Sequence, residues 1–183
     1  MPLQRRQFLT AIAATPALAM NAHAAEGPAD MPHVPWSRHA AIYQVNVRQF
    51  SADGTFKAAQ ADLPRLKALG VDVLWLMPIQ PIGVKERKGT LGSYYAIRDY
   101  TAVNPEFGSI DDLRKLVKQA HALGMHVIID WVGNHTAWDN PWVTQHPDWF
   151  KKNDKGEIYS VTFKNEAGNM EEWSDVVLSL IHI

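Results

Sequence analysis

The chain has 183 residues, of which 46% are hydrophobic and 20% are charged, and its formal net charge is −1. This composition is typical of a globular protein. The nearly balanced charge argues against nucleic acid or an anionic membrane surface as a partner. The chain has no cysteine, so disulfides play no part and the redox compartment cannot be inferred from them.

The N-terminus has the pattern of an export signal. A twin-arginine pair, Arg5-Arg6, precedes a mildly apolar run over residues 11–20, which ends in a small-x-small cleavage site. That run is too short and alanine-rich to anchor a protein in a bilayer, so we expect no membrane span. We predict a twin-arginine signal over residues 1–24 that engages the Tat export machinery, and a linker over residues 25–39. The protein would then work in the periplasm or outside a bacterial cell; an amphipathic N-terminal helix of a cytosolic protein is the alternative.

Strand and helix patterns alternate from residue 40 onward. In chain order, we expect a strand over 40–47, a helix over 56–69, a strand over 71–77, a helix over 110–123 and a strand over 125–129. Pro64 lies inside the first helical pattern, so this helix either kinks there or restarts with Asp62 as its N-cap. Ser109 is expected to cap the second helix, with Asp112 as its capping-box partner.

The β-α-β-α-β order predicts an α/β fold with a parallel sheet and right-handed crossovers. Spacing alone does not separate a barrel from an open, doubly wound sheet. A dinucleotide-binding fold is disfavoured because no glycine-rich phosphate loop follows the first predicted strand. The long loop over residues 78–99 is of a length that is usually functional or disordered.

Three polar residues, Asp130, Asn134 and His135, follow the third predicted strand. In an α/β chain, side chains just past the carboxyl end of a buried strand line the cleft where ligands bind. They offer a carboxylate, an amide oxygen that suits a hard cation, and a ring that forms hydrogen bonds when neutral. We therefore expect a ligand site at this strand end.

Four segments, residues 42–50, 69–78, 92–108 and 130–135, resemble the α-amylase family of glycoside hydrolases (family 13) in the family's order. The resemblance implies a TIM (β/α)8 barrel. Residues 40–135 would supply its first three strands, and 136–177 would begin a small domain inserted after the third. We expect no clear helix in this inserted segment.

The resemblance also implies roles for individual residues. Tyr95 matches the tyrosine that stacks on the sugar beside the scissile bond, and His135 matches the histidine that binds a hydroxyl of that sugar. Asp130 matches an aspartate that supports the polar network of the cleft. Asn134 matches a ligand of a structural Ca²⁺ ion found in many members; the further oxygen ligands that Ca²⁺ needs cannot be identified in the sequence.

The chemistry implied by the family is cleavage of α-glucosidic bonds with retention, in starch, maltodextrin or a related α-glucan or oligosaccharide. Two carboxyl groups about 5 Å apart carry it out, and in the family they follow later strands. We therefore expect no catalytic residue in this chain, an N-terminal fragment of the enzyme. The alternatives are a transglycosylase or isomerase of the family, a non-catalytic carbohydrate-binding or interaction protein, and an unrelated TIM-barrel enzyme.

The last six residues, 178–183, resemble one reading frame of a transposase adapter used in preparing sequencing libraries. We predict that they are an artefact of the gene model; a genuine apolar tail is the alternative. Three strands of a barrel leave open edges that pair with other chains. The 183-residue chain is therefore expected to be poorly soluble or molten, and inactive.

Overall fold

The computed structural model describes residues 34–180. The predicted signal over residues 1–24, most of the predicted linker and the last three residues lie outside this range. The chain divides into two units, residues 1–38 and 39–183. The described part opens with a short 3-10 helix, η1 (Pro35–His39), and the remaining elements belong to the second unit. Within residues 34–180, no helix is long and apolar enough to cross a membrane.

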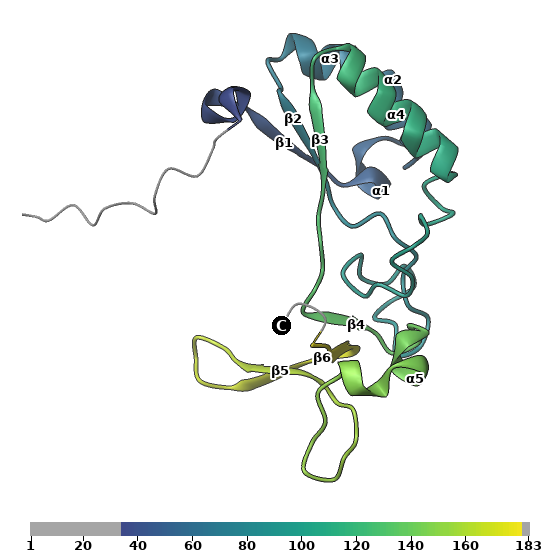
Figure 1. The fold of residues 1–183 in the computed structure, drawn as a ribbon, viewed down its shortest axis with the longest axis vertical. Helices are drawn as coiled ribbons and strands as arrows, with labels where there is room; N and C mark the ends of the chain where they lie inside the picture. The colour runs from purple at the N-terminus through teal and green to yellow at the C-terminus, as the bar shows by residue number, and fades with distance from the viewer. Residues whose placement is uncertain (1–33, 181–183) are drawn as a thin grey trace, which may run out of the picture. The chain divides into compact units, whose positions relative to one another are not determined.

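A parallel three-stranded sheet forms the predicted start of the α/β fold (Figure 1). It contains β1 (Ile42–Val45), β2 (Val73–Leu76) and β3 (His126–Ile129) in the order β1-β2-β3. Each strand is shorter than the sequence predicted. The first ends early because a short helix, α1 (Val47–Phe50), begins directly after Asn46, which is the N-cap residue of that helix.

The helices lie on one side of this sheet (Figure 1). They are α2 (Phe56–Ala61), α3 (Leu63–Ala68) and α4 (Ile110–Ala122). The predicted helix over 56–69 restarts at Leu63, with Pro64 in the first turn of α3. Asp62 is the N-cap residue of α3 as expected, but its side chain makes no capping hydrogen bond, and its carboxylate pairs with Arg65 instead. The core between helices and sheet includes Phe56 and Leu116, both at most 1% exposed.

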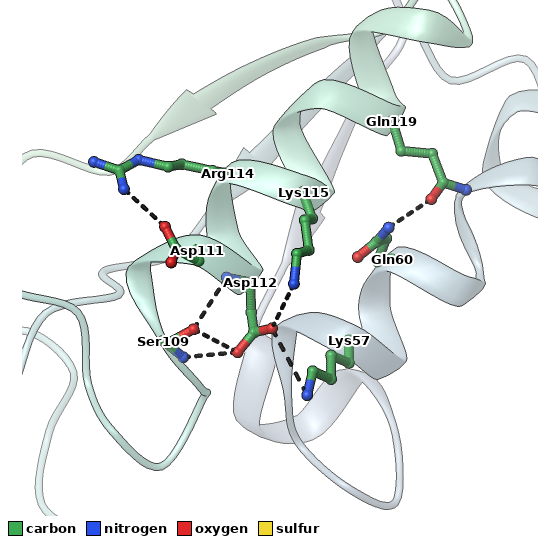
Figure 2. A network of polar contacts seen from close by, with 8 residues as sticks. All are labelled: Lys57, Gln60, Ser109, Asp111, Asp112, Arg114, Lys115 and Gln119. Carbon is green, nitrogen blue, oxygen red and sulfur yellow. Dashed lines mark hydrogen bonds and ion pairs between the residues drawn. The ribbon is translucent and has the colours of Figure 1, made fainter.

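Polar contacts at the start of α4 tie it to α2 (Figure 2). The predicted capping box is complete: the Ser109 hydroxyl accepts from the Asp112 backbone N–H at 3.2 Å, and the Asp112 carboxylate accepts from the Ser109 N–H at 3.0 Å. Lys57 of α2 lies 3.8 Å from the same carboxylate. Gln60 donates to Gln119 at 2.7 Å, so the two helices are joined near both the beginning and the end of α4.

The two outer strands leave apolar side chains in contact with solvent. Ile42 of β1 is 60% exposed, and Ile128 and Ile129 of β3 are each 43% exposed. The central strand differs, because Val73, Leu74 and Leu76 are buried. This pattern agrees with the expectation of open edges on either side of a buried central strand.

A second, antiparallel sheet follows β3 in the chain. Its strands are β4 (His135–Ala137), β5 (Ser160–Lys164) and β6 (Met170–Leu178), in the order β4-β6-β5. Two short helices lie between β4 and β5, α5 (Trp142–Gln145) and η2 (Pro147–Trp149). The expectation of no clear helix in this segment was wrong. The side chain of Asn140 accepts from the Trp142 N–H and so starts α5.

The end of the described chain makes specific contacts. The Ser179 hydroxyl donates to the Gly133 carbonyl at 2.8 Å, and the Leu180 N–H donates to the Trp149 carbonyl at 2.7 Å. The artefact predicted for residues 178–183 stays a prediction, as do the domain boundaries.

Candidate functional site

A cavity of about 440 Å³ lies where the long loop meets β4 and β6. Its walls are Lys88, Ser93, Tyr95, His135, Trp173, Asp175 and Val176. The loop between β2 and α4 supplies the first three, β4 supplies the histidine, and β6 supplies the rest. Two of the predicted site residues, Tyr95 and His135, therefore share one cavity.

Tyr95 and Asp130 form the central contact of the site. The Tyr95 hydroxyl donates to Oδ2 of Asp130 at 2.9 Å, which brings the loop onto the residue that follows β3. Burial raises the pKa of Tyr95, and the hydrogen bond to the Asp130 carboxylate raises it further. The phenol is therefore neutral at physiological pH and serves as a donor. Its ring remains a flat apolar surface at the cavity wall.

His135 is 7% exposed, and this burial lowers the pKa of its ring below the ordinary value. A hydrogen bond with the Tyr95 backbone and the charge of Asp175 oppose the shift without cancelling it. A neutral imidazole has one donor and one acceptor nitrogen. The ring of Trp173 meets His135 edge-on, with centroids 5.7 Å apart. His135 is thus held as a neutral hydrogen-bonding group beside an aromatic wall.

Lys88 and Asp175, which both line the cavity, form an ion pair with 3.1 Å between Nζ and Oδ1. The Asp175 side chain is 7% exposed, whereas the Lys88 side chain is 49% exposed. The position of Trp173 and Asp175 in the cavity could not be predicted from the sequence, because no local pattern indicates a contact made through an inserted sheet. The pair joins the long loop to the second sheet.

Tyr100 holds the stretch of chain between Asp130 and His135. Its hydroxyl lies 2.6 Å from the Val132 carbonyl and 3.0 Å from the His135 carbonyl, and both are acceptors. Its ring stacks on Trp142 at 5.1 Å, and burial raises its pKa. Tyr100 therefore fixes the turn that leads from the sheet into β4.

Asn134, the predicted calcium ligand, is exposed and outside the cavity lining. Its Nδ2 lies 3.2 Å from Nδ1 of His135, so the amide orients the imidazole. In residues 34–180, no three His, Cys, Asp or Glu side chains gather in a way that could hold a metal ion. Backbone and amide carbonyl oxygens also ligate Ca²⁺, so the calcium ion stays a prediction.

The sequence matches the family model described as "Alpha amylase, catalytic domain" over residues 34–175. This chain belongs to the α-amylase family. The family assignment and the partial-barrel fold expected from the sequence are thereby confirmed.

Characterised and solved relatives in the α-amylase family include both hydrolases and transferases. An α-amylase from Lactobacillus plantarum is 46% identical, with a TM-score of 0.69 over 76% of this chain and 31% of that one. An α-1,4-glucan:maltose-1-phosphate maltosyltransferase from Rhodospirillum rubrum is 39% identical over 68% of this chain and 20% of its own length. The trehalose synthase/amylase TreS of Mycobacterium tuberculosis is 35% identical, and the chain covers 22% of it. The chain thus spans about a fifth of these two curated relatives.

Proposed function

We propose that this α-amylase family chain supplies the sugar-binding part of an enzyme that acts on α-glucosidic bonds of starch, maltodextrin or a related α-glucan. The observation that carries the proposal is the hydrogen bond between Tyr95 and Asp130 at the wall of the cavity that also contains His135. It leaves the tyrosine ring free to stack on the apolar face of a sugar. The neutral His135 ring binds a hydroxyl of the same sugar.

The acidic side chains of the cavity region already have structural partners. Asp130 accepts from Tyr95, Asp175 pairs with Lys88, and Asp139 accepts from the Val84 N–H at 2.9 Å. Retaining glycosidases need two carboxyl groups poised about 5 Å apart at the scissile bond. We propose that the nucleophile and the acid come from parts of the enzyme outside this chain, and that this chain binds and orients the sugar.

We propose hydrolysis with retention as the reaction, with transfer to a sugar acceptor as its competitor, since both occur among the named relatives. Export by the twin-arginine route, to the periplasm or beyond, is proposed from the sequence pattern around Arg5-Arg6. Replacing both arginines by lysine and comparing the protein's abundance in periplasmic and cytoplasmic fractions tests it. Accumulation of the unchanged protein in the cytoplasm would contradict export.

The function is tested on the protein encoded by the complete locus, called the full-locus protein below. Maltodextrin turnover is measured for the parent, for Tyr95→Ala and for Tyr159→Ala, a matched control because Tyr159 is partly buried but does not line the cavity. We expect Tyr95→Ala to lower kcat/KM by about a hundredfold, on the scale of losing a stacking and positioning group, and Tyr159→Ala to leave it unchanged. Sugar binding without turnover in the parent would instead favour the non-catalytic alternative.

A further inference from the structure

The loop that carries Tyr95 is fastened to the end of β1 by one side chain, Arg48 of α1. Its Nη1 donates to the Gly92 carbonyl at 3.4 Å, and its Nη2 donates to the Leu91 carbonyl at 3.2 Å. Nη2 also lies 3.3 Å from the Glu106 carboxylate. One guanidinium thus holds two consecutive backbone carbonyls just before the turn on which Tyr95 lies.

The side chain of Arg48 is mostly buried and lies against an aromatic ring. Its side chain is only 16% exposed, and its guanidinium carbon lies 4.5 Å from the centre of the Tyr94 ring. A planar guanidinium can stack on an aromatic ring and direct two donors at neighbouring acceptors, which the ammonium of lysine cannot reproduce. Arg48 is therefore matched to its place by shape as well as by charge.

The held segment leads directly into the turn that presents Tyr95. Gly92 has a φ of +71°, and a Cβ at this position would lie 2.8 Å from a methyl carbon of Ile82. After it, the Tyr95 N–H donates to the Ser93 hydroxyl at 3.2 Å. Glycine adopts this conformation without strain, and the close approach of Ile82 leaves no room for a side chain. Arg48 binds the carbonyl of this residue and that of the residue before it.

We propose that Arg48 is a positioning residue for sugar binding, which holds the Leu91–Gly92 carbonyls so that Tyr95 reaches Asp130 and presents its ring to the substrate. The inference rests on the proposed function of Tyr95 for its consequence in substrate binding. The geometric part of the inference, which says that Arg48 determines the position of the Tyr95 ring, does not depend on the proposed function.

The test compares Arg48→Lys with Glu106→Gln in the full-locus protein. Arg48→Lys keeps the positive charge and can still pair with Glu106. It cannot donate to both the Leu91 and the Gly92 carbonyl as the guanidinium does. Glu106→Gln removes only the ion pair with a half-exposed carboxylate, which contributes little. We expect Arg48→Lys to raise KM for maltodextrin roughly tenfold, as for one lost charge-assisted hydrogen bond, with kcat nearly unchanged. Glu106→Gln is expected to leave KM within twofold of the parent.

A double-mutant cycle separates positioning from a general loss of stability. In a Tyr95→Ala background, Arg48→Lys should no longer change KM, because the ring that it places is absent. Arg48→Lys that raises KM equally in both backgrounds would overturn the proposal.

A readout without substrate distinguishes failure of this proposal from failure of the proposed function. In the protein labelled with ¹³C-tyrosine, the Tyr95 ring signal should shift in Arg48→Lys and remain in place in Glu106→Gln. A shift without any change in KM would mean that Arg48 places Tyr95 but that Tyr95 does not bind the sugar, which contradicts the proposed function. An unshifted Tyr95 signal in Arg48→Lys would overturn the role of Arg48 itself.

Discussion

The hydroxyl of Tyr95 donates to the carboxylate of Asp130 at 2.9 Å, although 35 residues separate the two in the chain. The contact links the long loop between β2 and α4 to the residue that follows β3. It means that neither residue acts alone, because Asp130 determines where the Tyr95 hydroxyl points, and Tyr95 occupies one oxygen of Asp130.

Removing this hydrogen bond tests whether it orders the site. Tyr95→Phe keeps the stacking surface and removes the donor, so we expect a modest loss of about 1–2 kcal/mol in sugar binding, smaller than that for Tyr95→Ala. Calorimetric titration of the full-locus protein with maltotriose measures it. Equal losses for the two variants would mean that the ring itself contributes nothing, in contradiction to a stacking role.

Phe56 provides a test of the core between helices and sheet. It is fully buried and packs edge-to-face on Phe107, with centroids 6.0 Å apart. Phe56→Ala should lower the free energy of unfolding of the full-locus protein by about 3–5 kcal/mol in urea denaturation. Leu69→Ala is the control, because Leu69 is 66% exposed and should change the free energy by less than about 0.5 kcal/mol. Similar losses for both variants would contradict the packing described above.

The capping box of α4 makes stability depend on pH through Asp112. Hydrogen bonds from Ser109 hold the pKa of Asp112 below its ordinary value of 3.8, and Lys57 and Lys115 lower it further. A carboxyl whose pKa is lowered by folding stabilises the native state well above pH 3.8, and this contribution is lost as the pH falls through the lowered pKa. The parent should therefore lose more stability between about pH 5 and pH 3 than Asp112→Asn does.

Thermal unfolding at several pH values measures the difference. At neutral pH, Ser109→Ala should cost about 1 kcal/mol, as for other N-caps. Parallel curves for the parent and for Asp112→Asn across the acidic range would contradict the role of the carboxylate.

The printed chain itself, without further strands, should be poorly soluble or molten. Ile42, Ile128 and Ile129 are exposed on the two outer strands, and open parallel edges of this kind pair with other chains. We expect no cooperative thermal transition and no starch hydrolysis for the purified 183-residue chain. A single cooperative transition together with hydrolysis would show that the chain folds and acts alone.

Local patterns predicted much of the barrel part of the fold. The capping box at Ser109 and the helix restart at Leu63 depend on neighbours within a few residues, so the sequence contains all the information needed. The two short helices between β4 and β5 were missed because four or fewer residues carry no helical period. Asp62 takes the predicted N-cap position of α3, but its carboxylate forms no capping hydrogen bond because Arg65, one turn away, competes for it.

The site could be predicted only in part. A resemblance in motif pointed to Tyr95, Asp130 and His135, and the structure brings all three together. The resemblance gave no indication of Lys88 and Asp175, whose contact joins the long loop to β6. Such a contact depends on the path of the inserted sheet, and neither periodicity nor turn signals encode that path.

A crystal structure of the full-locus protein with maltotriose bound would test the central claim most directly, that Tyr95 and His135 form a sugar site supported by Asp130. We predict a glucose ring stacked on Tyr95, with one of its hydroxyls within hydrogen-bonding distance of the His135 ring. A well-ordered sugar that contacts neither residue would contradict the account.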